Sequence, residues 1–129
     1  MKSKWVMKRK ADNSYKARLV AQGWKQVHGL DCGCTFDEVC RLQSVGIFVV
    51  ITVEFDLDMD HMDVSTAFLY ADIQEKVFME QAPGFVVKDN DGGELVMQLE
   101  KSVYGLDQSL GNWFHTIDPV LVDIGFVPA

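Results

Sequence analysis

The sequence HMDVSTAFLY, residues His61–Tyr70, carries the residues around which the rest of the chain is organised. Asp63 stands near the end of an expected extended segment, 55–64, and Phe68 follows five positions later. The small residues at 65–67 leave room for backbone amides to face an anion, and a carboxylate is a ligand for a hard cation. The stretch therefore predicts a metal ligand beside an anion-facing turn. A turn aspartate that hydrogen-bonds nearby amides is the alternative.

Length and composition predict one folded domain. The chain has 129 residues, of which 48% are hydrophobic and 24% are charged. Its longest apolar run, Val45–Val53, is about half of the ~20 residues that a membrane span needs. Residues 1–10 lack the apolar core of a secretory signal. We therefore expect no membrane association and, by default, an intracellular, cytoplasmic location.

The charges are divided unevenly along the chain. Residues up to Lys25 carry a net charge of +7, and those from Gln26 onward carry −14. A basic N-terminal segment followed by an acidic remainder suggests a phosphate-binding element joined to a metal-binding one. The alternative is that both sets of charged residues are ordinary solvent-exposed surface.

The cysteines are crowded into one short segment. Cys32, Cys34 and Cys40 could bind zinc together with His28, but a Cys-x-Cys spacing is tighter than that of zinc sites. An odd number of cysteines forms no disulfide framework. Reduced thiols without a metal are the favoured interpretation.

Patterns of apolar residues predict an α+β chain of antiparallel hairpins. Strands are expected at Trp5–Lys8 and Tyr15–Ala21, joined by turn residues at 11–14. Alternation places Lys16 and Arg18 on one face of the second strand, where they could grip a triphosphate or solubilise an exposed edge.

Further elements follow along the chain. We expect a buried helix at Leu42–Glu54, followed by a strand at Phe55–Val64 whose Asp56, Asp58 and Asp60 lie on a solvated face. Two further strands, Val77–Glu80 and Leu95–Leu99, are expected on either side of a turn at 88–93. A bend at Gly105 and a helix at Gly111–Ile124, which Pro119 kinks or restarts, complete the prediction. The chain is thus predicted to contain two or three helices.

Four motifs occur in a specific order. They are YKARLVAQG at Tyr15–Gly23, MDVSTAFLY at Met62–Tyr70, VFMEQAPGFV at Val77–Val86 and KSVYGL at Lys101–Leu106. With them the chain resembles the reverse transcriptase of copia-type retrotransposons, an RNA-directed DNA polymerase, nearly from end to end.

The resemblance implies the fingers and palm of a right-hand polymerase. Residues 1–45 and 74–105 would belong to the fingers. Residues 46–73 and 106–129 would belong to the palm, truncated before the family's second catalytic motif, Tyr-x-Asp-Asp.

The resemblance also implies a two-metal nucleotidyl-transfer site that uses Mg²⁺ or Mn²⁺, a deoxynucleoside triphosphate and an RNA or DNA primer–template. Asp63 would be the catalytic metal ligand, helped by the backbone carbonyl of Val64. The nucleotide would be bound by Lys16 and Arg18 at its triphosphate, by the amides of Ser65, Thr66 and Ala67, by Phe68 as a gate against a 2′-hydroxyl, and by Gly105.

The chain departs from the family pattern in two ways. No Asp-Asp pair occurs in the 129 residues, and one carboxylate cannot organise two octahedral magnesium ions. Asp107, Leu110 and Gly111 stand where the family usually has Lys, Pro and Arg. We therefore expect a fragment that is inactive alone and does not bind the metal productively. A nucleotide- or nucleic-acid-binding remnant and a decayed fragment without a role are the alternatives.

Overall fold

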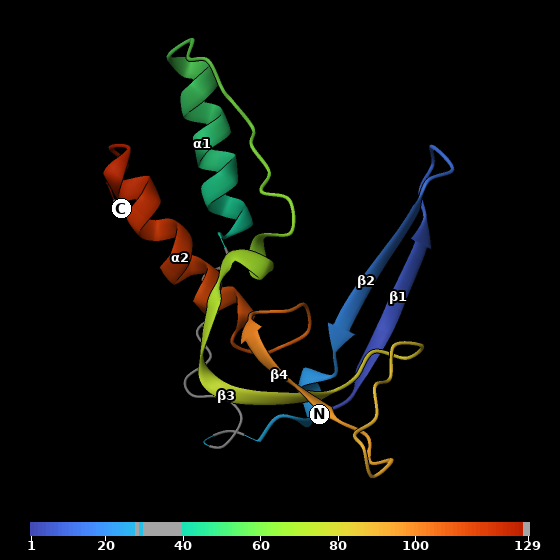
Figure 1. Cartoon of the computed structure of the whole chain (residues 1–129). Coiled ribbons are helices and arrows are strands. Elements are labelled where there is room, and N and C mark those ends of the chain that lie inside the picture. The colour runs from blue at the N-terminus through green and yellow to red at the C-terminus, as the bar shows by residue number, and fades with distance from the viewer. Residues whose placement is uncertain (28, 30–39, 128–129) are drawn as a thin grey trace.

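The computed structural model describes residues 1–27, 29 and 40–127, which form an α+β arrangement (Figure 1). In chain order the elements are β1 (Ser3–Arg9), β2 (Tyr15–Ala21), η1 (Gly23–Lys25), α1 (Leu42–Glu54), η2 (Ala67–Tyr70), β3 (Asp72–Glu80), β4 (Val96–Lys101) and α2 (Ser109–Asp123). β1 pairs with β2 and β3 with β4, each as a separate antiparallel sheet. The predicted class, an α+β chain of antiparallel hairpins with two or three helices, is confirmed for the described residues, which contain two α-helices.

The first hairpin forms where the sequence predicts it, with β2 matching to the residue. Its turn places Asn13 at a φ of 65°, a conformation that asparagine tolerates well. The carboxylate of Asp12 accepts hydrogen bonds from the hydroxyl of Ser14 at 2.6 Å and from its amide at 2.9 Å. These bonds, the hydroxyl first, lower the pKa of Asp12. The ionised form of Asp12 therefore stabilises the turn.

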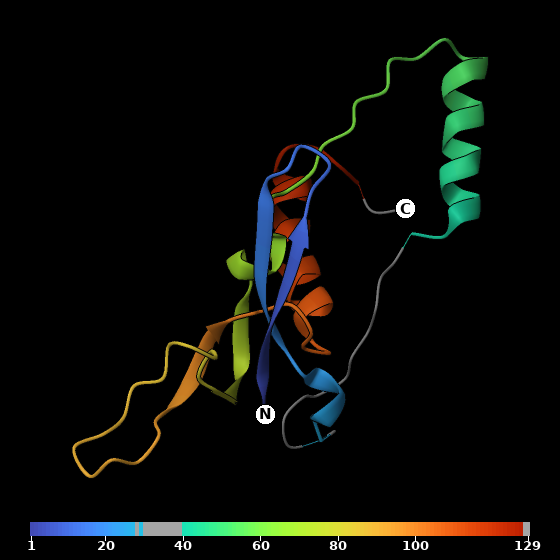
Figure 2. The ribbon, with the colours of Figure 1, turned by 90° about the vertical axis from the view of Figure 1, so that its right-hand side faces the viewer.

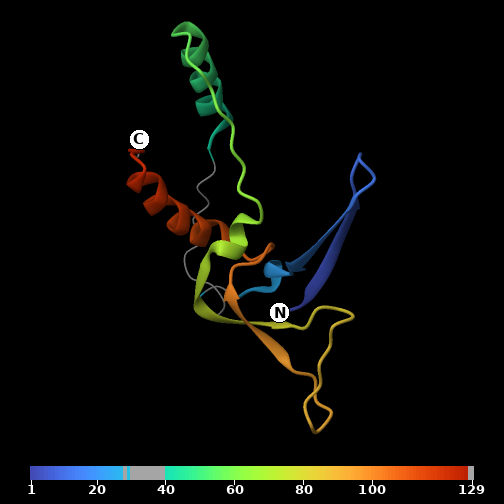
Figure 3. The same ribbon diagram turned by 45° about the horizontal axis from the view of Figure 1, so that its top comes forward.

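The core lies where the two hairpins meet. Val77 and Met79 alternate with exposed residues along β3, so both point to one face. They are buried together with Ala21 from β2 and Leu106 from the loop after β4. The hairpins project in different directions from this small core (Figure 3).

The loop after β4 is fastened to the end of β2 by its backbone. The carbonyl of Tyr104 accepts a hydrogen bond from the amide of Ala21 at 2.8 Å, and that of Gly105 accepts one from Gly23 at 2.9 Å. Gly105 has a φ of +88°, and a Cβ there would lie 2.2 Å from the carbonyl oxygen of Ala21. A side chain on Gly23 would lie 2.0 Å from the carbonyl oxygen of Gly105. Both positions require glycine because the two backbones touch.

α2 begins two residues earlier than predicted and runs through Pro119 as one helix. Of the two outcomes predicted at Pro119, a kink or a restart, the restart does not occur. The helix ends in a glycine motif. Gly125 has a φ of 102°, and the amide of Phe126 donates to the carbonyl of Leu121 at 2.9 Å. No helix among the described residues is long and apolar enough to cross a bilayer.

α1 has the predicted bounds, but the predicted burial is wrong. None of its residues is buried, and Ile47 and Phe48 are 62% and 56% exposed. Figures 1 and 2 show the helix standing away from both sheets. An apolar helix is stabilised when another element buries its side chains, but the composition does not specify which element does so.

The predicted strand at 55–64 is also wrong. Asp56 adopts a left-handed φ of 49°, and the amide of Leu57 donates a hydrogen bond to the carbonyl of Thr52 at 2.9 Å. These two features form a C-terminal cap that ends α1 and turns the chain away from the helix axis. Residues 57–64 then continue as exposed, irregular chain. A strand requires a hydrogen-bonded neighbour, and within the described ranges no strand pairs with this segment. Alternation of side chains was therefore a misleading signal here.

Candidate functional site

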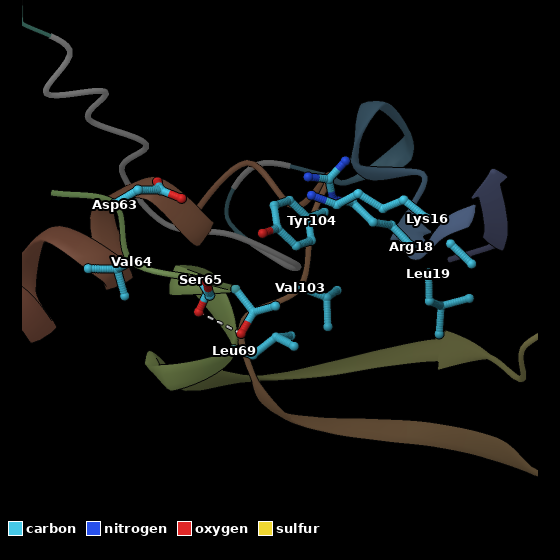
Figure 4. Close-up of a pocket in the computed structure, with 11 residues that line it drawn as sticks. Lys16, Arg18, Leu19, Asp63, Val64, Ser65, Leu69, Val103 and Tyr104 are labelled. Carbon is cyan, nitrogen blue, oxygen red and sulfur yellow. Dashed lines mark hydrogen bonds between the residues drawn. The ribbon is translucent and has the colours of Figure 1, made fainter. Parts of the chain in front are cut away.

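Three segments that are distant in the sequence enclose a cavity of about 570 Å³ (Figure 4). Its lining residues are Lys16, Ala17, Arg18 and Leu19 from β2, Asp63, Val64, Ser65, Thr66 and Leu69, and Val103 and Tyr104. The volume is within the range of small-molecule sites. Six of the nine site residues predicted from the sequence are therefore brought together, namely Lys16, Arg18, Asp63, Val64, Ser65 and Thr66.

The β2 side of the cavity is basic. Lys16 and Arg18 share a strand face, and both side chains extend toward Tyr104 in Figure 4. Within the described part of the chain neither cation forms a salt bridge, whereas Lys101 pairs with Asp72. Charge at this wall is thus not neutralised by a neighbouring carboxylate. Such cations can donate charge-assisted hydrogen bonds to phosphate oxygens.

The opposite side is formed by a constrained turn. Thr66 has φ 56° and ψ 36°, a left-handed conformation that is unusual for a β-branched residue. Its hydroxyl donates to the carbonyl of Ser65 at 2.7 Å, and its carbonyl accepts from the amide of Leu69 at 2.9 Å. Asp63 and Val64 immediately before the turn are exposed. Strained backbone of this kind is concentrated at functional sites.

Three predicted site residues do not line the cavity. Ala67 and Phe68 lie in η2 behind the turn, and Gly105 joins the loop to β2. The ring of Phe68 contacts the ring of Tyr104 at a centroid distance of 5.0 Å and an interplanar angle of 63°. Contact of these three residues with a nucleotide stays a prediction.

Tyr104 is a site residue that the sequence analysis missed. It lines the cavity, and the guanidinium carbon of Arg18 lies 5.3 Å from its ring centroid. The available signal was its position directly before Gly105, the glycine of the predicted bend. Because the bend at Gly105 contacts β2, the preceding residue, Tyr104, also lies beside β2.

The described residues do not form a complete divalent-metal site. Asp63 and Val64, the two residues predicted to bind a metal, both line the cavity. No group of three or more His, Cys, Asp or Glu residues that could hold a metal ion occurs in 1–27, 29 and 40–127. Mg²⁺ prefers six oxygen ligands in near-octahedral geometry. The set therefore fits at most one part of such a site.

The zinc alternative falls largely outside the described residues. His28, Cys32 and Cys34 belong to the segment that the structure does not describe. Cys40 is exposed and has a free thiol. Metal binding by this group is therefore untested.

Comparisons with known proteins cover the whole chain. The family model described as reverse transcriptase (RNA-dependent DNA polymerase) matches residues 1–129. The chain is 37% identical over 123 residues to the retrovirus-related Pol polyprotein from transposon TNT 1-94 of Nicotiana tabacum, covering 92% of this chain and 9% of that protein. It is 36% identical over 129 residues to the corresponding polyprotein from transposon RE2 of Arabidopsis thaliana, covering 96% and 9%.

The chain thus spans about a tenth of the length of the curated relatives that it matches. No solved structure matches it significantly. The resemblance to copia-type retrotransposons is confirmed by these polyproteins, and the chain belongs to the reverse transcriptase (RNA-dependent DNA polymerase) family.

Proposed function

We propose that the cavity binds the triphosphate of an incoming deoxynucleotide in an RNA-directed DNA polymerase. One observation carries the proposal. Asp63 follows Arg18 by 45 positions in the sequence, yet both residues line one cavity of about 570 Å³. Lys16 and Arg18 supply cations for phosphate oxygens, and the turn at Ser65 and Thr66 supplies backbone opposite them.

The division into fingers and palm forms part of the same proposal. Residues 1–45 and 74–105 are assigned to the fingers, and 46–73 and 106–129 to the palm. Ala21, Val77 and Met79, which belong to the fingers grouping, pack together across the two hairpins, and Leu106, the first residue of the second palm segment, completes this buried core. α1, most of which lies in the palm grouping, contributes no residue to it.

Nucleotide binding by the chain alone is proposed to occur without nucleotidyl transfer. In polymerases of this kind two divalent ions, Mg²⁺ or Mn²⁺, activate the primer hydroxyl and stabilise the triphosphate. Asp63 and the carbonyl of Val64 are the two metal ligands that the proposal assigns to the lining residues, and the 129 residues contain no adjacent aspartate pair. These ligands are too few for two metal ions.

Calorimetric titration of the chain with dTTP tests the binding proposal. Lys16→Ala and Arg18→Ala should each weaken binding about threefold to tenfold, the scale of a partly exposed charge-assisted hydrogen bond. Arg9→Ala is the matched control, because Arg9 also lies over a tyrosine ring, that of Tyr15 at 5.9 Å, but does not line the cavity. Equal affinities for all three variants and the unchanged chain would reject the proposal.

Primer extension on an RNA template with Mg²⁺ or Mn²⁺ tests the proposal that the chain alone does not catalyse nucleotidyl transfer. We expect no incorporation of nucleotide by the chain alone. Incorporation that disappears in Asp63→Asn would overturn the proposed inactivity and would assign Asp63 a catalytic role.

A primer–template contact is a second candidate function that the hairpin supports. Lys4 and Lys8 in β1 pair with Val20 and Lys16 in β2, so these three exposed lysines share one face. A row of cations can follow a phosphate backbone. The net charge of −14 after Lys25 opposes such binding elsewhere on the chain.

A further inference from the structure

The loop after β4, which carries Tyr104 of the cavity wall, is anchored at its start by the first turns of α2. The hydroxyl of Ser109 donates a hydrogen bond to the carbonyl of Val103 at 2.6 Å. The side-chain amide of Asn112 donates one to the hydroxyl of Ser102 at 3.1 Å. Ser102 and Ser109 are both buried. The first part of the loop is therefore fixed by side chains of the helix.

The second part of the loop is held only weakly by its own backbone. The amide of Leu106 lies 3.4 Å from the carbonyl of Val103, and the amide of Ser109 lies 3.3 Å from the carbonyl of Leu106. Both distances exceed the range of about 2.7–3.2 Å that is usual for N–H···O hydrogen bonds. The position of this part of the loop therefore depends on contacts from other segments.

Gln26 supplies two such contacts through its side chain. Its Oε1 accepts a hydrogen bond from the amide of Asp107 at 2.9 Å. Its Nε2 donates one at 2.9 Å to Oε1 of Gln108, which is buried and caps the N-terminus of α2. The backbone amide of Gln26 donates to the carbonyl of Gly23, which ties the residue to η1. One carboxamide thus joins η1 to the loop and to the start of α2.

Gln26 does not line the cavity, but the loop that it holds does. Asp107 follows Tyr104 by three positions, and the ring of Tyr104 lies 5.3 Å from the guanidinium carbon of Arg18. A cation–π contact at this distance favours one placement of the guanidinium. A shift of the loop would move the ring away from Arg18, the residue to which we assign the triphosphate.

We propose that Gln26 is a positioning residue of the nucleotide cavity, acting on Arg18 through the loop after β4. The inference rests on the proposed nucleotide function and deepens it. The carboxamide of Gln26 holds the loop between η1 and α2, which keeps the Tyr104 ring beside Arg18. The guanidinium is then in place for phosphate oxygens before the nucleotide arrives, so that less ordering is required on binding.

Calorimetric titration of the full chain with dTTP tests the effect on binding. Gln26→Met keeps an unbranched side chain but loses both hydrogen bonds, and it should weaken binding about twofold to tenfold. Ser3→Ala is the matched control, because it removes another partly buried bond between distant segments, from the hydroxyl of Ser3 to the carbonyl of Gln81 at 3.2 Å. The control should bind dTTP as the unchanged chain does. Equal affinities of Gln26→Met and Ser3→Ala would overturn the proposal.

Hydrogen exchange of the chain without nucleotide tests the positioning directly. The amides of Ala21 and Gly23 donate to the carbonyls of Tyr104 and Gly105. In Gln26→Met both amides should exchange about twofold to tenfold faster, whereas the amide of Glu80, which donates to Met1, should exchange as before. Unchanged exchange at Ala21 and Gly23, or equal acceleration at Glu80, would overturn the proposal, since the second result indicates a general loss of stability.

The NMR signal of the Arg18 side chain gives a readout that a general loss of stability would not move. The Tyr104 ring shifts this signal through its ring current, and Tyr104→Leu gives the value without the ring. Gln26→Met should move the Arg18 signal toward the value in Tyr104→Leu, and Ser3→Ala should not. An Arg18 signal that stays in place in Gln26→Met would contradict the proposal.

Failure of the proposed function gives a different pattern. If the chain does not bind dTTP, or if Arg18→Ala leaves dTTP binding unaltered, both proposals fall. If Arg18→Ala weakens dTTP binding while Gln26→Met does not, only the present inference fails.

Discussion

Replacing Gly105 with alanine should destabilise the fold more than an ordinary glycine substitution. At a φ of +88° an L-residue costs about 1–2 kcal/mol. The new Cβ would also lie 2.2 Å from the carbonyl oxygen of Ala21 and 2.7 Å from Cγ1 of Val20, so the loop has to move away from β2. That movement breaks the two hydrogen bonds at Ala21 and Gly23, each contributing about 0.5–1.5 kcal/mol. The sum is about 2–5 kcal/mol.

Urea unfolding followed by circular dichroism measures this difference. Gly84→Ala is the matched control, because Gly84 has the same φ of +88° but a Cβ added there would meet no heavy atom within 4 Å. It should lose only the conformational part, about 1–2 kcal/mol. Equal losses in free energy of unfolding for Gly105→Ala and Gly84→Ala would refute the close contact between the loop and β2.

Other predictions concern the core, the turn and nucleic-acid binding. Met79→Ala should reduce the free energy of unfolding by about 2–5 kcal/mol, because Met79 is 1% exposed, whereas Phe78→Ala, at a side chain that is 47% exposed, should cost less in the same urea titration. The pKa of Asp12 is lower in the folded chain than its ordinary value of 3.8. The ionised carboxylate therefore stabilises the turn fully at a pH above 3.8, and this stabilisation is lost as the pH falls through the pKa of the folded chain. Carbon NMR should show that the pKa of Asp12 rises toward 3.8 in Ser14→Ala. If the chain binds a primer–template, Lys16→Ala should reduce the slope of log affinity against log salt by about one in a fluorescence anisotropy titration, and an unchanged slope would exclude a phosphate contact.

Features that depend on neighbouring residues were predictable from the sequence. β2 and α1 have the predicted bounds because a turn with Asp12 and Asn13 precedes the strand and an apolar run of helical length forms the helix. The lining residues at Lys16, Arg18 and Asp63 were selected through family motifs, and the structure places them on one cavity.

Features that depend on distant partners were not predictable. The exposure of α1 and the irregular chain at 57–64 depend on which elements pack or pair with them, and local patterns carry no such information. Tyr104 reaches the cavity because Gly105 and Gly23 allow two backbones to touch. That contact joins positions about 80 residues apart, so a single sequence reveals the glycines but not their pairing.

Binding of a nucleoside triphosphate in the cavity between β2, the Asp63 turn and Tyr104 can be located residue by residue. The experiment is a titration of the isotopically labelled chain with dTTP, followed by the amide chemical shifts. We expect the largest changes at residues 16–19, 63–66 and 103–104, with the turn at 88–94 unaffected. No change at the first three segments, or changes centred on residues 88–94, would contradict the account.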